Sequence, residues 1–178
     1  MTELMKAWQV SKPGELDCLK WVELARPEPA GNECLVRVKA AALNFSDVLM
    51  VGGKYQIKPP LPFTPGQEIS GSIVYPGAAS KYMVGQKVAS KVPWGGFAEY
   101  SLTRDDMMIP LTDDVSLEHA VALPVVYTTA HIALFNRAKL KAGETVLVHA
   151  GAGGVGLAAI QLAKSFGATV IATVGNLA

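Results

Sequence analysis

HAGAGGVGLAAIQLAKSFGATVIATV, residues 149–174, is the stretch of sequence that decides the fold of this chain. The apolar run 145–149 predicts a strand, the pattern from 155 to 166 predicts a helix, and the run 169–174 predicts a second strand. Gly151, Gly153 and Gly156 fit the G-x-G-x-x-G spacing between the first strand and the helix. Strand, glycine-rich turn, helix and strand form the first half of a dinucleotide-binding fold.

The glycines of this turn have distinct expected roles. Gly151 permits the tight turn after the strand, Gly153 lets backbone N–H groups approach a pyrophosphate, and Gly156 lets the helix lie close to the sheet. The start of the helix, at Gly154 and Val155, presents unpaired N–H groups and a partial positive charge to the phosphates. The alternative is a glycine-rich loop that only packs.

The end of the second predicted strand favours NADP over NAD. NAD-binding folds usually place Asp or Glu about twenty residues after the turn, on the ribose 2′-OH. Here the region reads Thr173-Val174-Gly175-Asn176, without an acid. The missing carboxylate removes the repulsion that would exclude a 2′-phosphate. No basic residues that would grip this phosphate follow in the sequence, and NAD remains the alternative.

Composition limits the class of protein. Hydrophobic residues make up 50% of the chain and charged residues 17%, so it can bury a core. The formal net charge is +1, and scattered Lys and Arg argue against a nucleic-acid surface. Cys18 and Cys34 lack CxxC spacing, and neither a secretory signal nor a membrane-length apolar run is visible. We expect a cytoplasmic protein that binds neither nucleic acid nor membrane.

The first two thirds of the chain read as short β-segments separated by Gly and Pro. Residues 35–40 alternate between apolar and charged side chains, as a half-buried strand does. Similar runs lie at 5–10, 19–24, 68–75, 88–92 and 97–102. This spacing predicts an antiparallel barrel or sandwich. One helix is expected from Asn44 to about Met50, with Asn44 as its N-cap.

The pattern changes near Ser116. From Leu117 to Lys139 apolar residues recur at helical intervals, and Pro124 either kinks this helix or lies in the first turn of its second half. The predicted domains are therefore 1–118, which is β-rich, and 119–178, which carries the strand–helix–strand unit. The predicted fold class is α+β followed by α/β.

Several segments resemble the zinc-free quinone oxidoreductases of the medium-chain dehydrogenase/reductase superfamily. They are AALNFSDVLMVGGKY, PPLPFTPGQEISG, YMVGQKVAS, GGFAEY, ALPVVYTTAHIAL and GETVLVHAGAGGVGLAAIQLAKSFGATVIATV, in the order of the family. The resemblance implies a GroES-like antiparallel β-barrel followed by an incomplete Rossmann (βαβ) domain. Family members carry roughly as much chain again, so we expect a truncated form with weak or no turnover. The segment that pairs subunits in the family's homodimers would be missing.

The resemblance also bears on zinc. Zinc-dependent members place Cys before the S/T-D pair and His before the Glu of the PG-x-E motif. Here NF precedes Ser46-Asp47 and Gln67 precedes Glu68, and an amide and a phenyl ring do not replace a thiolate and an imidazole. We therefore expect no metal. Without a Lewis acid to stabilise an alkoxide, the consistent acceptors are electrophilic, namely a quinone or an enone that takes hydride from NADPH.

The resemblance implies further site residues. Asn44 and Asp47 match an N-x-x-D pair beside the nicotinamide, and the alternative is a helix cap. Tyr55 matches a proton donor of enoyl-thioester reductases, and the alternative is a packed aromatic. Thr128 and Thr129 match hydroxyls near the nicotinamide, and the alternative is a bond to the carbonyl four residues earlier. The predicted catalytic residues are Asn44, Asp47 and Tyr55, and the predicted cofactor-binding residues are Asn44, Thr128, Thr129, Gly151, Gly153, Gly154, Val155 and Gly156.

Two other functions remain open. One is a 2-enoyl thioester reductase in which Tyr55 is essential as the proton donor. The other is a non-catalytic barrel that serves as an interaction module. Gln67 and Glu68 are expected to be structural polar groups lining the cleft. Trp94 either walls a pocket for an aromatic substrate or packs in the barrel.

Overall fold

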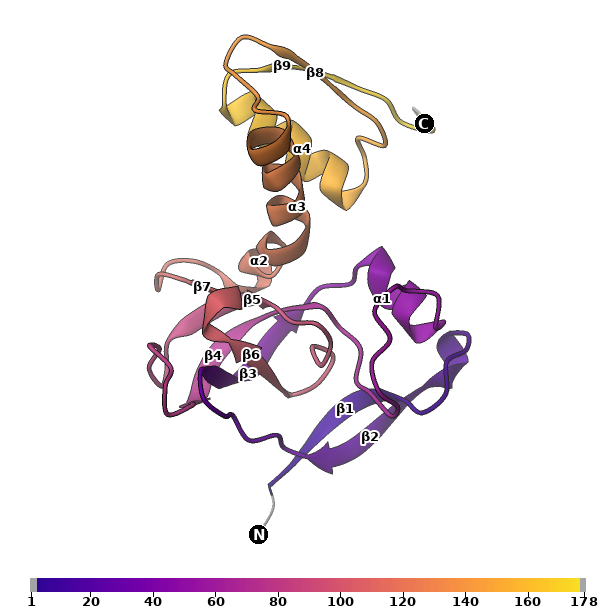
Figure 1. The fold of residues 1–178 in the computed structure, drawn as a ribbon, viewed down its shortest axis with the longest axis vertical. Helices are drawn as coiled ribbons and strands as arrows, with labels where there is room; N and C mark the ends of the chain where they lie inside the picture. Colours follow the sequence, from indigo (N-terminus) through magenta and orange to yellow (C-terminus); the bar gives the residue numbers. More distant parts are fainter. Residues whose placement is uncertain (1–2, 177–178) are drawn as a thin grey trace. The chain divides into compact units, whose positions relative to one another are not determined.

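The computed structural model of the protein describes residues 3–176, which divide into two compact units between Ala122 and Leu123 (Figure 1). The boundary drawn from the sequence lies earlier, after residue 118. Each unit has a hydrophobic core of its own. Among the described residues, none of the helices combines the length and the hydrophobicity that a membrane crossing requires.

The first unit is a GroES-like half-barrel of antiparallel strands, as the sequence predicts. Five strands pair in the order β6-β3-β4-β5-β7, and β1 pairs with β2. Bridges from Ala7 to Ala98 and from Val10 to Phe63 join this hairpin to the rest of the unit. The strands are β1 (Leu4–Val10), β2 (Leu19–Ala25), β3 (Glu33–Ala41), β4 (Glu68–Pro76), β5 (Lys87–Lys91), β6 (Tyr100–Arg104) and β7 (Met108–Pro110).

Alternating side chains fill the barrel. On β3, Val36 is buried and Val38 partly buried, whereas Arg37 and Lys39 between and beyond them are exposed, which confirms the predicted alternation. The sequence did not predict β7, because three residues are too few for a period-two pattern. The main core consists of Cys34, Val36, Ile69, Ile73, Tyr82, Val88, Val92 and Met108.

One short helix packs beside the barrel. Helix α1 (Phe45–Val51) begins directly after Asn44, so the predicted helix and its N-cap are confirmed. Met50 and Val51 pack with Val10 of β1 and with Phe63 in a second core cluster. The last residues of α1 are therefore packed against the barrel. Two single-turn 3-10 helices, η1 (Leu16–Cys18) and η2 (Asp105–Met107), complete the unit together with α2 (Leu117–Ala120).

The second unit contains the predicted strand–turn–helix–strand segment. Strands β8 (Thr145–Val148) and β9 (Thr169–Ala172) are parallel and paired in register, and α4 (Gly154–Ser165) connects them and packs against both (Figure 1). The core of this unit is built from Leu134, Leu140 and Ala163, with Val146 of β8 and Val170 of β9 packed against it.

The helical segment predicted over 117–139 is interrupted before Pro124, as one of the two stated alternatives expects. Helix α2 ends at Ala120, and helical structure resumes as η3 (Leu123–Tyr127), α3 (Thr128–His131) and η4 (Ile132–Arg137), of which η3 and η4 are π-helical. The break falls at Val121 and Ala122, ahead of Leu123 and Pro124. Pro124 then lies in the first turn of the resumed helix, where its missing N–H has no consequence.

Candidate functional site

The glycine-rich turn follows β8 directly. Ala150, not a glycine, takes the left-handed conformation, with φ of 53°. Gly151 is buried, and its N–H donates to the carbonyl oxygen of Thr173 at 2.9 Å. A Cβ at Gly151 would lie 3.0 Å from Cβ of Ala172. The role predicted for Gly151 is thus corrected, since close packing rather than positive φ requires a glycine there.

Gly153 and Gly156 both lie near the carbonyl oxygen of Ala150. A Cβ at Gly156 would lie 2.3 Å from the carbonyl oxygen of Ala150, so the helix does approach the turn as closely as expected. At the exposed N-cap Gly153, the nearest atom to an added Cβ is that same oxygen at 3.4 Å. No described side chain caps α4, so the N–H groups of Gly154 and Val155 face an open cradle. Such a cradle fits the diphosphate of a dinucleotide.

The two predicted threonines of α3 differ. Both side chains are exposed. The hydroxyl of Thr129 donates to the carbonyl oxygen of Val125 at 2.7 Å, which is the alternative stated for it above. Thr128 therefore remains the better candidate for a cofactor contact. The neighbouring Tyr127 hydroxyl donates to Oε1 of Gln161, and this bond ties the end of η3 to α4.

Asn44, Asp47 and Glu68 form a buried polar network at the start of α1. The Asn44 N–H donates to Oδ2 of Asp47 at 2.8 Å, which is the helix-cap geometry. The Asn44 side chain turns instead to the start of β4, where Nδ2 donates to Oε1 of Glu68 at 2.8 Å. Asp47 is 1% and Glu68 2% exposed. A hydrogen bond to a buried carboxylate holds the Asn44 amide in one orientation. The sequence analysis missed this partner.

Burial dominates the ionisation of Asp47. Desolvation raises the pKa of the Asp47 carboxyl. Interactions with the backbone N–H groups of Asn44, Gly66 and Gln67 lower this pKa, but by less than burial raises it. Oδ1 of Asp47 has no hydrogen-bond partner among the described residues, so the cost of burying this oxygen is not offset by a hydrogen bond. Asp47 is thus held in a place that favours its neutral form.

We expect Asp47→Asn to reduce the pH dependence of stability. The folded carboxyl titrates above its ordinary pKa of 3.8, so the folded state keeps a proton that the unfolded state releases. The free energy of unfolding therefore falls as pH rises from 3.8 through the raised pKa, and Asp47→Asn removes this fall. Urea unfolding from about pH 3 to about pH 7 measures it. The exposed Asp17→Asn is the control, and equal slopes in wild type and Asp47→Asn would contradict the expectation.

Gln67, at one of the positions where the metal question arises, lies beside Ser46 of the Ser46-Asp47 pair. Their side chains are bonded to each other, with the Ser46 hydroxyl donating to Oε1 of Gln67. Gln67 is 3% exposed. Within residues 3–176, no group of three or more His, Cys, Asp or Glu side chains is placed to hold a metal ion. The phenyl ring of Phe45 and the amide of Gln67 differ from the thiolate and imidazole ligands that zinc prefers.

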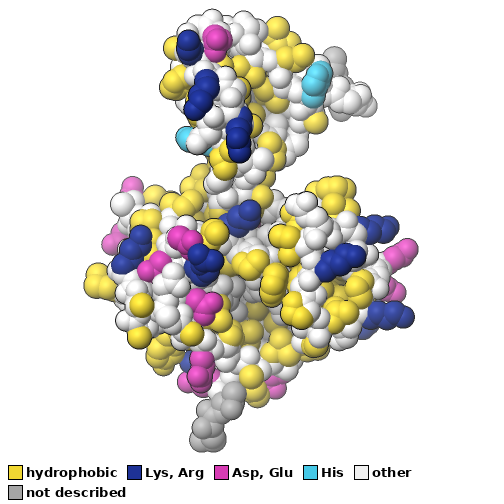
Figure 2. Space-filling view, in the orientation of Figure 1, with side chains coloured by type: hydrophobic (Ala, Val, Ile, Leu, Met, Phe, Trp, Pro, Cys, Tyr) yellow, Lys and Arg dark blue, Asp and Glu magenta, His cyan; other side chains and the backbone are white. Residues whose placement is uncertain are grey.

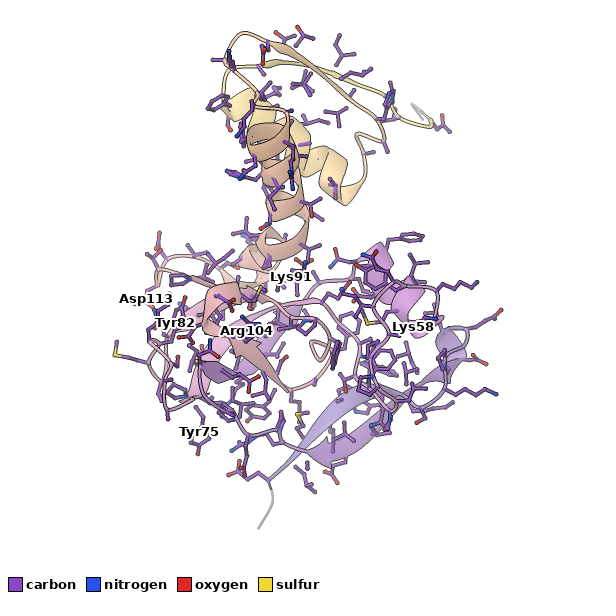
Figure 3. The ribbon with its side chains drawn as sticks, viewed as in Figure 1. Lys58, Tyr75, Tyr82, Lys91, Arg104 and Asp113 are labelled. Atoms are coloured by element: carbon purple, nitrogen blue, oxygen red, sulfur yellow. The ribbon has the colours of Figure 1, made fainter. Side chains whose placement is uncertain are left out.

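A cavity of about 500 Å³ in the first unit is lined by Tyr55, Gln67 and Trp94. Lys91 and Arg104, labelled in Figure 3, also line it. Aromatic walls with a few polar groups suit a flat, conjugated ligand. The structure therefore brings Tyr55 together with Gln67 and Trp94, whereas Asn44 and Asp47 lie outside the walls of this cavity.

A larger groove lies elsewhere on the first unit. It measures about 600 Å³ and is lined by Trp8, Trp21 and Leu43 among others. Hydrophobic side chains, yellow in Figure 2, are exposed over much of the visible face of this unit. None of the predicted site residues lines the groove, so the smaller cavity beside Gln67 is the better candidate for the acceptor.

Comparison with known proteins agrees with this geometry. Residues 30–113 match the family described as the alcohol dehydrogenase GroES-like domain. The human quinone oxidoreductase is 38% identical over 177 residues, which are 98% of this chain and 54% of that protein. The chain corresponds to the N-terminal part of quinone-oxidoreductase-like medium-chain dehydrogenases/reductases. The resemblance read from the segments of the sequence is confirmed.

Solved structures of this superfamily match over the same extent. The quinone oxidoreductase of Thermus thermophilus, described with its NADPH complex, is 38% identical with a TM-score of 0.85, over 97% of this chain and 54% of that one. The CurK enoyl reductase is 32% identical with a TM-score of 0.87, over 97% of this chain and 53% of that one. The chain spans about half the length of these relatives.

Proposed function

We propose that this chain carries the cofactor cradle and the acceptor cavity of a zinc-independent reductase. The reaction is hydride transfer from NADPH to a quinone or to another activated alkene. The observation that carries the proposal is the open cradle at Gly153, where no described side chain hydrogen-bonds to the N–H groups at the start of α4. Similarity to a quinone oxidoreductase described with NADPH supports the choice of cofactor.

NADPH, when bound, supplies the hydride. The N–H groups of Gly154 and Val155 hold its diphosphate, and the absence of a Cβ at Gly153 lets it approach. Thr128 is the candidate hydroxyl for the nicotinamide end. Glu68 and Asp47 hold Asn44 by its side-chain amide and its backbone N–H, so the amide keeps one orientation.

The cavity beside Gln67 is the proposed binding site of the hydride acceptor. Trp94 and Tyr55 offer flat apolar faces to a conjugated ring. The Tyr55 phenol is the candidate donor of a proton to the acceptor as charge develops on it. Asn44 and Gln67 provide no thiolate or imidazole for zinc, and a quinone takes hydride without such help.

Direct measurement of nucleotide binding tests the proposal. Calorimetric titration with NADPH and NADH is expected to show binding of both, with NADPH the tighter. NADPH consumption is then followed with a panel of quinones and enones, and quinones are expected to give the faster oxidation. Failure to bind either nucleotide, together with no oxidation, would overturn the proposal and favour the interaction-module alternative.

A 2-enoyl thioester reductase is the second candidate, because Tyr55 lines the cavity and the CurK enoyl reductase is similar along nearly the whole chain. In that case Tyr55→Phe is expected to abolish reduction of a crotonyl thioester, since an enolate carbon needs a positioned proton donor. Reduction of quinones would persist, because hydroquinone oxygens take protons from water. Tyr75→Phe, at a side chain 52% exposed, is the control. Thioester reduction by Tyr55→Phe at the wild-type rate would exclude this role.

A further inference from the structure

The carboxyl ends of β8 and β9 carry a hydrogen-bonded pair of exposed side chains. Nδ1 of His149 and Oγ1 of Thr173 are 2.9 Å apart. The backbone fixes their position, because the Thr173 N–H donates to the carbonyl oxygen of Val148 at 3.0 Å and its own carbonyl oxygen accepts from Gly151 at 2.9 Å. The pair therefore lies directly beside the glycine-rich turn.

This edge of a parallel sheet is where ligands bind in dinucleotide folds. An acid at the end of the second strand takes the ribose 2′-OH of NAD, and it would repel a 2′-phosphate. Here the strand end offers Thr173 followed by Val174, Gly175 and Asn176. A hydroxyl and an imidazole stand in the region where the acid would be.

The charges of the second unit also favour an anion at this edge. Glu144 is the single acidic residue in positions 123–178. It precedes β8, at the opposite end of that strand from His149, and its carboxylate accepts from the Lys141 N–H at 2.7 Å. Lys164, in the last turn of α4, precedes the amino end of β9 and not the end that carries Thr173. Among the described residues of the second unit, no acidic side chain therefore opposes a phosphate beside His149.

The pair has the hydrogen-bonding capacity that a phosphate needs. When the Thr173 hydroxyl donates to Nδ1, the ring proton is on Nε2, which can then donate outward. When the ring is protonated, Nδ1 donates to Thr173, the hydroxyl proton is released for a second donation, and the ring carries a positive charge. Charge-assisted donation to phosphate is the stronger kind of hydrogen bond.

We propose that His149 and Thr173 read the adenosine 2′-phosphate and so select NADPH over NADH. This inference rests on the proposed function, because it assigns one end of the same cofactor. It adds two residues that the glycine-turn motif does not contain. The interaction lies entirely within the second unit and depends on neither the acceptor cavity nor turnover.

Calorimetric affinities for NADPH and NADH test the inference on the full chain. His149→Leu and Thr173→Val are each expected to weaken NADPH binding roughly tenfold, the loss of one charge-assisted hydrogen bond, and to change NADH binding less than about twofold. Thr169→Val makes the same substitution at the exposed amino end of β9 and is expected to change neither. Gly175→Asp, where an added Cβ meets no atom within 4 Å, restores an acid and is expected to reverse the preference.

The outcomes separate the inference from the proposed function. An equal loss of NADPH and NADH affinity in His149→Leu and Thr173→Val would show that the pair only shapes the turn, and it would overturn the inference alone. Unchanged affinities would do the same. Wild-type protein that binds neither nucleotide would overturn the proposed function and the inference with it. Circular dichroism confirms that each variant keeps the fold.

Discussion

Replacing Gly156 by alanine is expected to weaken NADPH binding by roughly 100-fold. The new Cβ would lie 2.3 Å from the carbonyl oxygen of Ala150 and 2.9 Å from Cα of Gly151. Both are backbone atoms of the turn, so the helix and the turn must move apart. Overpacking of this kind costs about 3 kcal/mol, and each 1.4 kcal/mol is a tenfold change in affinity. The N–H groups of α4 then no longer meet the diphosphate.

Alanine substitutions at two other glycines of the same segment serve as comparisons for Gly156→Ala. At Gly175 an added Cβ meets no atom within 4 Å, so Gly175→Ala is expected to bind NADPH as the wild type does. Gly153→Ala meets only the Ala150 oxygen at 3.4 Å and should keep its fold, but its methyl group occupies the open side of the cradle. Calorimetric titration compares the three variants. Wild-type affinity in Gly156→Ala would show that the turn does not hold the cofactor.

The sequence predicts the nucleotide-binding segment well because its signals are local. The glycine spacing and the apolar runs on either side determine β8, the turn and α4 without help from the rest of the chain. The left-handed residue is the exception, since Ala150 takes the conformation that glycine normally supplies. Packing of Gly151 against Ala172 decides where the glycine is needed, and that contact is not visible in the sequence.

The polar network around Asn44 shows which contacts cannot be predicted from the sequence. The capping relation between Asn44 and Asp47 is a three-residue pattern, and it was predicted. The bond from Asn44 to Glu68 joins α1 to β4, and only the folded barrel brings these residues together. No local pattern tells which carboxylate a buried amide meets. The same reason explains why the pair of His149 and Thr173, on two strands, was not predicted.

Replacing Gly71 of the half-barrel by alanine is expected to destabilise the first unit strongly. In Gly71→Ala the new Cβ would lie 2.0 Å from the carbonyl oxygen of Arg37 and 2.9 Å from Cγ1 of Val36, both on β3. Gly71 is on β4, which is paired on both sides, with Val38 of β3 and with Val88 of β5. Neither neighbour can move without breaking a ladder, so we expect a loss of about 3 kcal/mol in the free energy of unfolding.

Urea unfolding followed by tryptophan fluorescence measures this loss, and Gly14→Ala, whose Cβ would meet Cys18 at an ordinary 3.4 Å, is the matched control. A midpoint for Gly71→Ala equal to that of Gly14→Ala would contradict the expectation. Strand β4 begins at Glu68, which holds the Asn44 amide, so a displaced β4 also releases the amide from its fixed direction. Gly71→Ala should therefore impair acceptor reduction in the absence of urea even where the unit stays folded.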